Sequence, residues 1–217
     1  SGALKLVDGF FENPILNSPY EEPTRHHALG EDGQPLNLPP EHGRRRSALI
    51  SPVPPAKKQK KRDAQADFLL EEDEEGQAYT LQNINEIRAH VSAWRRIPNP
   101  SDWGVTPVTQ RLLQYWRDHN FETVRPFFCQ VEAVETAIWL TEVAPRLKQH
   151  AHLWGNIQQA NHDANPELMR MALKLATGAG KTTVMAMLIA WQTLNAVRSA
   201  NSSRFSRAFL IVAPGIT

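Results

Sequence analysis

Cysteine is almost missing from this sequence, since Cys129 is the only one in 217 residues. A single cysteine excludes an internal disulfide framework and a zinc site built from four thiolates. Long apolar runs are missing too, because no stretch approaches the roughly 18 apolar residues of a membrane-spanning helix. The first residues show no basic segment followed by an apolar one, so no signal peptide is visible. We therefore expect no integral membrane protein and no disulfide-rich secreted domain.

Excess charge of one sign is also lacking, because the formal net charge is only +1. This balance gives no global argument for nucleic-acid binding, although a local patch can still bind phosphates. Methionine is absent before Met169. We therefore expect the chain to be processed, tagged or cut from a longer protein.

Proline is plentiful but uneven, with nine of the 16 prolines in the first 55 residues. Each proline fixes its own φ and disfavours helix at the preceding residue, so long helices are not expected there. A basic run, Lys57–Arg62, and an acidic run, Glu71–Glu75, follow and are typical of a solvated linker. We predict an irregular, charged arm over residues 1–79, with short strands near Leu4–Val7 and Ala48–Val53, and a folded region over 80–217.

The folded region begins with helical patterns. Apolar residues at spacings of three and four predict a helix over 84–94, a second after Thr106-Pro107, and a third over 126–144. Polar residues dominate 149–166, which we interpret as an inserted connection with histidines on its surface. Cys129 is expected to be a buried, inert thiol, since no base partner is indicated.

An α/β pattern follows. Residues 171–176 predict a short buried strand, 181–196 a helix, and the apolar run 208–212 a parallel strand covered on both faces. Strand, helix and strand in this order form a βαβ unit. The fold class expected from this order is α/β, preceded by the helical segment and the irregular, proline-rich arm.

A glycine-rich loop lies at the junction of the first strand and the helix. The phosphate-binding loop reads G-x-x-x-x-G-K-[ST]; Gly180, Lys181 and Thr182 match it, whereas Leu175 replaces the first glycine. Gly178 and Gly180 let the backbone turn its N–H groups toward a phosphate. Lys181 would contact the β- and γ-phosphates, and Thr182 would supply a hydroxyl to Mg²⁺. The predicted nucleotide-binding residues are Thr177, Gly178, Ala179, Gly180, Lys181, Thr182 and Thr183. A glycine turn with an incidental lysine is the alternative, but it does not explain the paired glycines.

The loop resembles motif I of superfamily 2 helicases and translocases, and an apolar residue at its first position is similar to motif I of restriction-type ATPases. Arg125–Thr136 resembles the glutamine-containing adenine-recognition region of these enzymes, and Phe209–Thr217 resembles motif Ia. Asn13–His26 is similar to the N-terminal region of DEAD/DEAH-type Res subunits of type III restriction enzymes.

Site residues follow from this resemblance. It implies that Gln130 reads the adenine edge, whereas a surface residue at the start of a helix is the alternative. It also implies that Ala213, Pro214 and Gly215 approach a nucleic-acid backbone, the alternative being an ordinary exit from a strand.

The resemblance further implies a function. The chain would be the ATP-binding N-terminal part of an ATP-dependent DNA helicase or translocase, with the beginning of a RecA-like P-loop lobe. ATP and Mg²⁺ would be its cofactors, double-stranded DNA its substrate, a methyltransferase subunit its partner, and the bacterial cytoplasm its location. Because no acidic D-E-x-H-like segment or arginine finger follows the loop, we expect these 217 residues alone not to hydrolyse ATP efficiently.

Two alternatives stay open at this point. One is the motor of a type I-like restriction enzyme or a DNA-repair helicase. The other is a non-enzymatic module for docking or DNA binding within residues 1–100, with Lys57–Arg62 as its phosphate contact.

Overall fold

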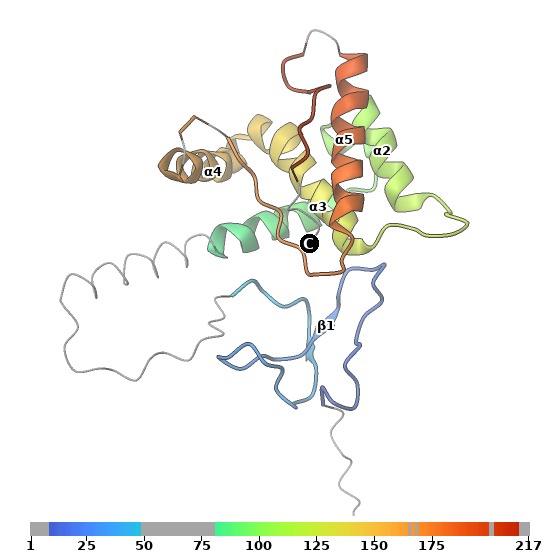
Figure 1. The fold of residues 1–217 in the computed structure, drawn as a ribbon, viewed down its shortest axis with the longest axis vertical. Coiled ribbons are helices and arrows are strands. Elements are labelled where there is room, and N and C mark those ends of the chain that lie inside the picture. The colour runs from blue at the N-terminus through green and yellow to red at the C-terminus, as the bar shows by residue number, and fades with distance from the viewer. Residues whose placement is uncertain (1–8, 49–80, 165, 168, 200–201, 213–217) are drawn as a thin grey trace, which may run out of the picture. The chain divides into compact units, whose positions relative to one another are not determined.

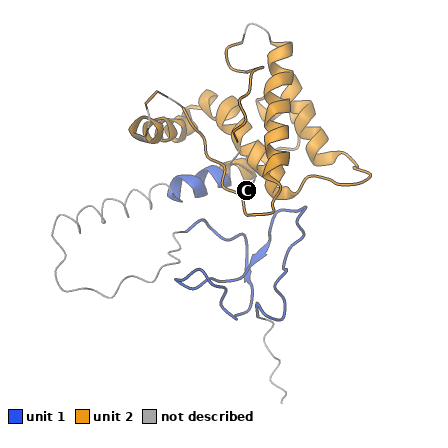
Figure 2. Cartoon of the chain, in the orientation of Figure 1, with its two compact units in different colours: residues 1–89 blue, residues 90–217 orange. Residues whose placement is uncertain are grey.

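The structure is a computed structural model, and it describes residues 9–48, 81–164, 166–167, 169–199 and 202–212 (Figure 1). The chain divides into two compact units, residues 1–89 and 90–217 (Figure 2). Besides a helix over 81–95, the elements are β1 (Arg25–His26), β2 (Glu41–His42), η1 (Pro100–Trp103), α2 (Pro107–Asp118), α3 (Phe128–Ile138), η2 (Trp139–Val143), η3 (Ala144–Arg146), η4 (Lys148–His150), α4 (Ala151–Ala164) and α5 (Lys181–Arg198).

Unit 1 consists of an irregular chain stabilised by local hydrogen bonds. β1 and β2 pair antiparallel, with Arg25 opposite His42 and His26 opposite Glu41. The Asn17 side chain accepts from the Thr24 and Arg25 amides and donates to the Arg25 carbonyl at 2.9 Å. Asparagine suits this position, because its amide carries both donors and acceptors for backbone groups. The short strands predicted at Leu4–Val7 and Ala48–Val53 lie almost wholly outside the described residues.

An asparagine links this irregular chain to the helix over 81–95 within unit 1. The Asn85 Oδ1 accepts from the Ser47 amide, and Nδ2 donates to the Ser47 carbonyl, both at 2.8 Å. One side chain thus satisfies both backbone groups of a residue 38 positions away.

Unit 2 is helical throughout its regular structure. α2 begins at Pro107, whose missing N–H costs nothing at the first helical position, and the Thr106 hydroxyl caps the helix by accepting from the Thr109 amide. α2 and α3 both pack against α5. The fully buried side chains of the core include Val91, Leu113, Val134, Ile138, Leu153 and Trp139.

The three helices predicted before residue 145 are confirmed, at 81–95, Pro107–Asp118 and Phe128–Ile138. The last one continues as the π-helical turn η2, which contains the buried Glu142. The carboxylate of Glu142 accepts from the Thr109 hydroxyl at 2.6 Å, the Trp191 indole at 2.7 Å and the Thr106 amide at 2.8 Å. Asn195 joins the cluster by donating to Thr109. This polar cluster connects α2, η2 and α5.

A second buried carboxylate is paired with cations. Glu135 is fully buried, and its two oxygens accept from Arg95 Nε at 2.6 Å and Arg117 Nε at 2.7 Å. The Arg117 guanidinium also stacks over the Trp103 ring at 4.5 Å. Pairing of this kind offsets the cost of removing a charge from water.

Three predictions about secondary structure are wrong. Residues 171–176 and 208–212 form no strand, and most of their side chains are exposed; Leu210 is 90% exposed. An apolar run encodes a preference for burial, but a strand also needs a neighbouring backbone, and the described part of unit 2 contains no strand to pair with. The third segment, 149–166, contains the helix α4 instead of a plain connection. Leu153, buried on α4 and four residues before Ile157, reveals the helical spacing.

Candidate functional site

The glycine loop lies immediately before α5, as its sequence predicts. The Ala179 amide donates to the Ala176 carbonyl at 3.3 Å and closes a turn. Gly178 and Gly180 have φ of 79° and 73°, which is the left-handed region that side chains with a Cβ rarely adopt. The two glycines are therefore required by the backbone path of the loop.

Backbone donors collect at the end of this loop. The amides of Gly178, Gly180, Lys181 and Thr182 have no hydrogen-bond partner among the described residues. They stand at the N-terminus of an 18-residue helix, where the aligned peptide dipoles place partial positive charge. Unpaired amides and this dipole together favour an anion such as a phosphate.

The side chains of the loop are accessible. Thr177, Lys181, Thr182 and Thr183 are all exposed. The Lys181 ammonium folds back and donates to the Ala176 carbonyl at 2.9 Å. This contact is exposed to solvent. The ammonium can therefore leave the Ala176 carbonyl and contact an anion at the loop without breaking a buried hydrogen bond.

Gln130, on α3, contacts the loop. Its Oε1 accepts from the Phe127 amide at 2.9 Å, which caps the start of α3, and its Nε2 donates to the Ala179 carbonyl at 2.9 Å. The side chain is 5% exposed. A Cβ at Gly180 would collide with Gln130 Nε2. The structure thus brings together two motifs that are 49 residues apart in the sequence.

The contact between Gln130 and the loop uses only part of the amide's capacity. A glutamine amide carries two N–H donors and two acceptor lone pairs, and Gln130 uses one of each. The sequence analysis missed the contact with Ala179. It also missed the cap at Phe127, although a glutamine at the third position of a helix is a known capping signal.

Other candidate residues are placed differently. Ala213, Pro214 and Gly215 lie outside the described residues, as does the basic run Lys57–Arg62. Cys129 is exposed, so the prediction of a buried thiol is wrong. Its position on the first turn of α3 faces solvent, whereas the next residue, Gln130, is buried.

The histidines also depart partly from expectation. His152 and His162 are exposed on α4 as predicted, but His150 is 8% exposed. Its ring lies 4.2 Å from that of His90 and 5.1 Å from that of Trp139, measured between centroids. The prediction that this histidine lies on the surface is wrong, because aromatic packing buries its ring.

The described residues contain no group of three or more His, Cys, Asp or Glu side chains that is arranged to hold a metal ion. None of the helices in the described part of the chain has the length and apolar character needed to cross a membrane. Comparison of the chain with protein families, curated proteins and solved structures gives no match.

Proposed function

We propose that the loop between Ala176 and Thr183 binds the phosphates of ATP together with Mg²⁺. The observation that carries this proposal is the set of unpaired amides at the start of α5, with the exposed Lys181 beside them. A glycine turn with an incidental lysine would not require two residues at positive φ directly before a long helix.

Each residue has a role in this proposal. The amides of Gly178, Gly180 and Lys181 would donate to phosphate oxygens, and Lys181 would exchange the Ala176 carbonyl for the β- and γ-phosphates. The exposed Thr182 hydroxyl would be a ligand of Mg²⁺, an ion that keeps several waters and needs few protein ligands. Mg²⁺ would neutralise part of the charge on the phosphates.

Gln130 would serve the same site in two ways. Its hydrogen bond to Ala179 holds the loop in position. The remaining donor and lone pair of its amide match the acceptor N7 and the donor N6 of adenine. The hypothesis of adenine recognition thus rests on spare hydrogen-bonding capacity next to the loop.

The wider proposal follows the resemblance of the motifs. The chain would be the ATP-binding part of a DNA helicase or translocase similar to the Res subunit of type III restriction enzymes. This proposal includes a double-stranded DNA substrate, a methyltransferase partner and a cytoplasmic location in bacteria. A translocase of this kind holds DNA mainly through its phosphates, which gives little sequence specificity.

The test is nucleotide binding, measured with a fluorescent ATP analogue and Mg²⁺ on the whole chain. Lys181→Ala removes the ammonium, and we expect the dissociation constant to rise about 10- to 100-fold, from roughly 1.5–3 kcal/mol for a charged hydrogen bond.

Lys174→Ala is the matched control for this experiment. Lys174 is also exposed and lies seven residues earlier, so its removal changes the net charge equally. We expect its affinity to stay within about twofold of the unaltered chain. Equal losses in both variants, or binding of the analogue to neither the variants nor the unaltered chain, would refute the nucleotide site.

A further inference from the structure

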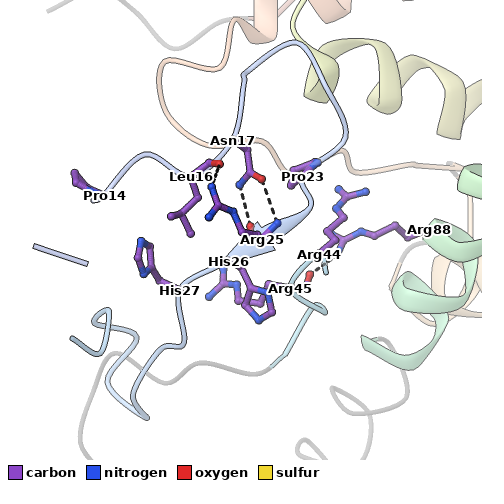
Figure 3. Close-up of a pocket in the computed structure, with 10 residues that line it drawn as sticks. All are labelled: Pro14, Leu16, Asn17, Pro23, Arg25, His26, His27, Arg44, Arg45 and Arg88. Atoms are coloured by element: carbon purple, nitrogen blue, oxygen red, sulfur yellow. Dashed lines mark hydrogen bonds between the residues drawn. The ribbon is translucent and has the colours of Figure 1, made fainter. Parts of the chain in front are cut away.

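Unit 1 contains a cleft whose lining is strongly basic. Its volume is about 340 Å³. A single water needs only about 10–15 Å³ on the same measure, so the cleft has room for several waters or for a phosphate group. Figure 3 shows the side chains that surround it: Pro14, Leu16, Asn17, Pro23, Arg25, His26, His27, Arg44, Arg45 and Arg88.

Charge is segregated around this cleft. Within residues 9–48 and 81–89, every arginine except Arg46 lines the cleft, and no aspartate or glutamate does. A carboxylate from outside the lining also reaches a lining residue, since Glu41 Oε2 lies 3.3 Å from His26 Nε2. The other lining histidine, His27, is held by the carbonyl of Asn13 at 2.9 Å. A concave surface that is lined by positively charged side chains attracts anions.

The arginines are positioned by backbone groups. Arg25 donates from Nη2 to the Leu16 carbonyl, and Arg88 donates from Nη1 to the Arg45 carbonyl, both at 3.3 Å. Arg44 and Arg88 make further interactions as well. A guanidinium has five N–H donors, and Arg25 uses one of them on Leu16, so its other donors can face a ligand. Bidentate donation to phosphate is the strongest use of such donors.

From this arrangement we propose that the cleft binds phosphates of a nucleic-acid backbone. Sites for small molecules are mostly apolar and bury most of the ligand. This cleft has the opposite character, because arginine and histidine dominate its lining and Arg25 and Arg45 are exposed. A polymer needs such an open surface, since its chain must enter and leave the site. The proposal does not depend on nucleotide binding at the loop before α5.

The experiment measures the affinity of the whole chain for a short fluorescein-labelled DNA duplex by anisotropy, over a series of salt concentrations. The test variant is Arg25→Gln with Arg45→Gln. We expect affinity to fall about 10- to 60-fold at about 0.1 M salt. The slope of the logarithm of the association constant against log[salt] is negative, and its magnitude should decrease by about two, as for two lost phosphate contacts.

Arg46→Gln is the matched control, because Arg46 is exposed and adjacent but does not line the cleft. The magnitude of the salt-dependence slope for this variant should change by less than about 0.5. The single variant Arg45→Gln separates binding from folding, since the Arg45 side chain makes no hydrogen bond to the described residues. Arg45→Gln should keep the thermal unfolding midpoint of the unaltered chain. The magnitude of its salt-dependence slope for DNA binding should decrease by about one.

Several outcomes would overturn the proposal. Equal losses for Arg46→Gln and the double variant would mean that only overall charge matters. An unchanged slope in the double variant would exclude phosphate contacts at the cleft. Displacement of the duplex by inorganic phosphate at millimolar concentration, or retention of phosphate without DNA binding, would assign the cleft to a small anion instead.

Discussion

At the scale of single residues, Gly180 is constrained in two ways. It combines φ of 73° with the side chain of Gln130 directly beside its Cα. Either condition alone favours glycine, and together they connect the loop to the start of α3. Gly178 shares the positive φ, but nothing lies within 4 Å of the place where its Cβ would stand.

This difference between the two glycines gives a prediction. Gly180→Ala should lower the free energy of unfolding by about 2–4 kcal/mol, because it displaces the Gln130 amide from its two hydrogen bonds and adds a backbone strain of roughly 1–2 kcal/mol. Gly178→Ala should cost only the strain. Urea denaturation monitored by tryptophan fluorescence compares the two.

Two further variants make the comparison sharper. In a chain that already carries Gln130→Ala, Gly180→Ala should cost only the backbone strain, because the side chain that it would displace is gone. Gly155→Ala, in the middle of α4 with open space around it, should stabilise by about 0.5–1 kcal/mol. If Gly178→Ala is as costly as Gly180→Ala, the close contact with Gln130 is not part of the folded state.

At the scale of elements, unit 2 depends on the polar cluster around Glu142. The donors at its carboxylate are a hydroxyl, an indole N–H and a backbone amide, all of them neutral. Since they come from α2, α5 and the turn before α2, the cluster fixes how these elements meet. A fully satisfied buried network specifies one arrangement of its elements, whereas a partly satisfied one is costly.

A conservative substitution at Glu142 tests whether this cluster stabilises the packing of α2 and α5. Glu142→Gln keeps the shape but replaces an acceptor with an N–H₂ group that faces existing donors. We expect a loss of about 1–3 kcal/mol in the free energy of unfolding, which is the cost of leaving buried polar groups unpaired. Urea denaturation gives the value.

Glu122→Gln is the control, because Glu122 is exposed between α2 and α3. Its effect should stay within about 0.5 kcal/mol. A loss no larger for Glu142→Gln than for this control would show that the cluster contributes nothing to the packing of α2 against α5.

The sequence predicts some of these elements and contacts correctly and misses others. Apolar spacing and the Thr106-Pro107 pair predict α2 correctly, since cap and periodicity are local signals. The path of the glycine loop is local as well. The contact between Gln130 and Ala179 is not, because it requires the packing of α3 beside α5, which no local pattern specifies. The runs at 171–176 and 208–212 fail as strands for the same reason, since pairing depends on a second segment.

At the scale of the whole molecule, the chain consists of two compact units, and each has its own candidate for phosphate binding. In unit 1 the basic cleft depends on the irregular segment 9–48 keeping its path beside the helix over 81–95. Asn85 links the two through both backbone groups of Ser47, in addition to the hydrogen bond from Arg88 to the Arg45 carbonyl.

Removing the hydrogen bonds between Asn85 and Ser47 should make the chain near Arg44, Arg45 and Arg46 open more often to a protease. In Asn85→Ala we expect limited trypsin digestion to cut after Arg44, Arg45 and Arg46 about three- to tenfold faster, because loss of roughly 1 kcal/mol raises the population of locally open chain. Mass spectrometry of the early fragments locates the cuts. Gln82→Ala, exposed on the same helix, should leave the rate unchanged. Similar rates in the two variants would mean that Asn85 does not hold the segment.

The exposed apolar run at 208–212 has a consequence for how readily the chain associates with itself. Phe209, Leu210, Ile211 and Val212 are all exposed, in a segment with high strand propensity, no proline and no charge. Segments of this composition pair readily between molecules. A net charge of +1 provides little repulsion to keep such molecules apart. We therefore expect this short segment to promote self-association of the chain, more strongly as the protein concentration rises.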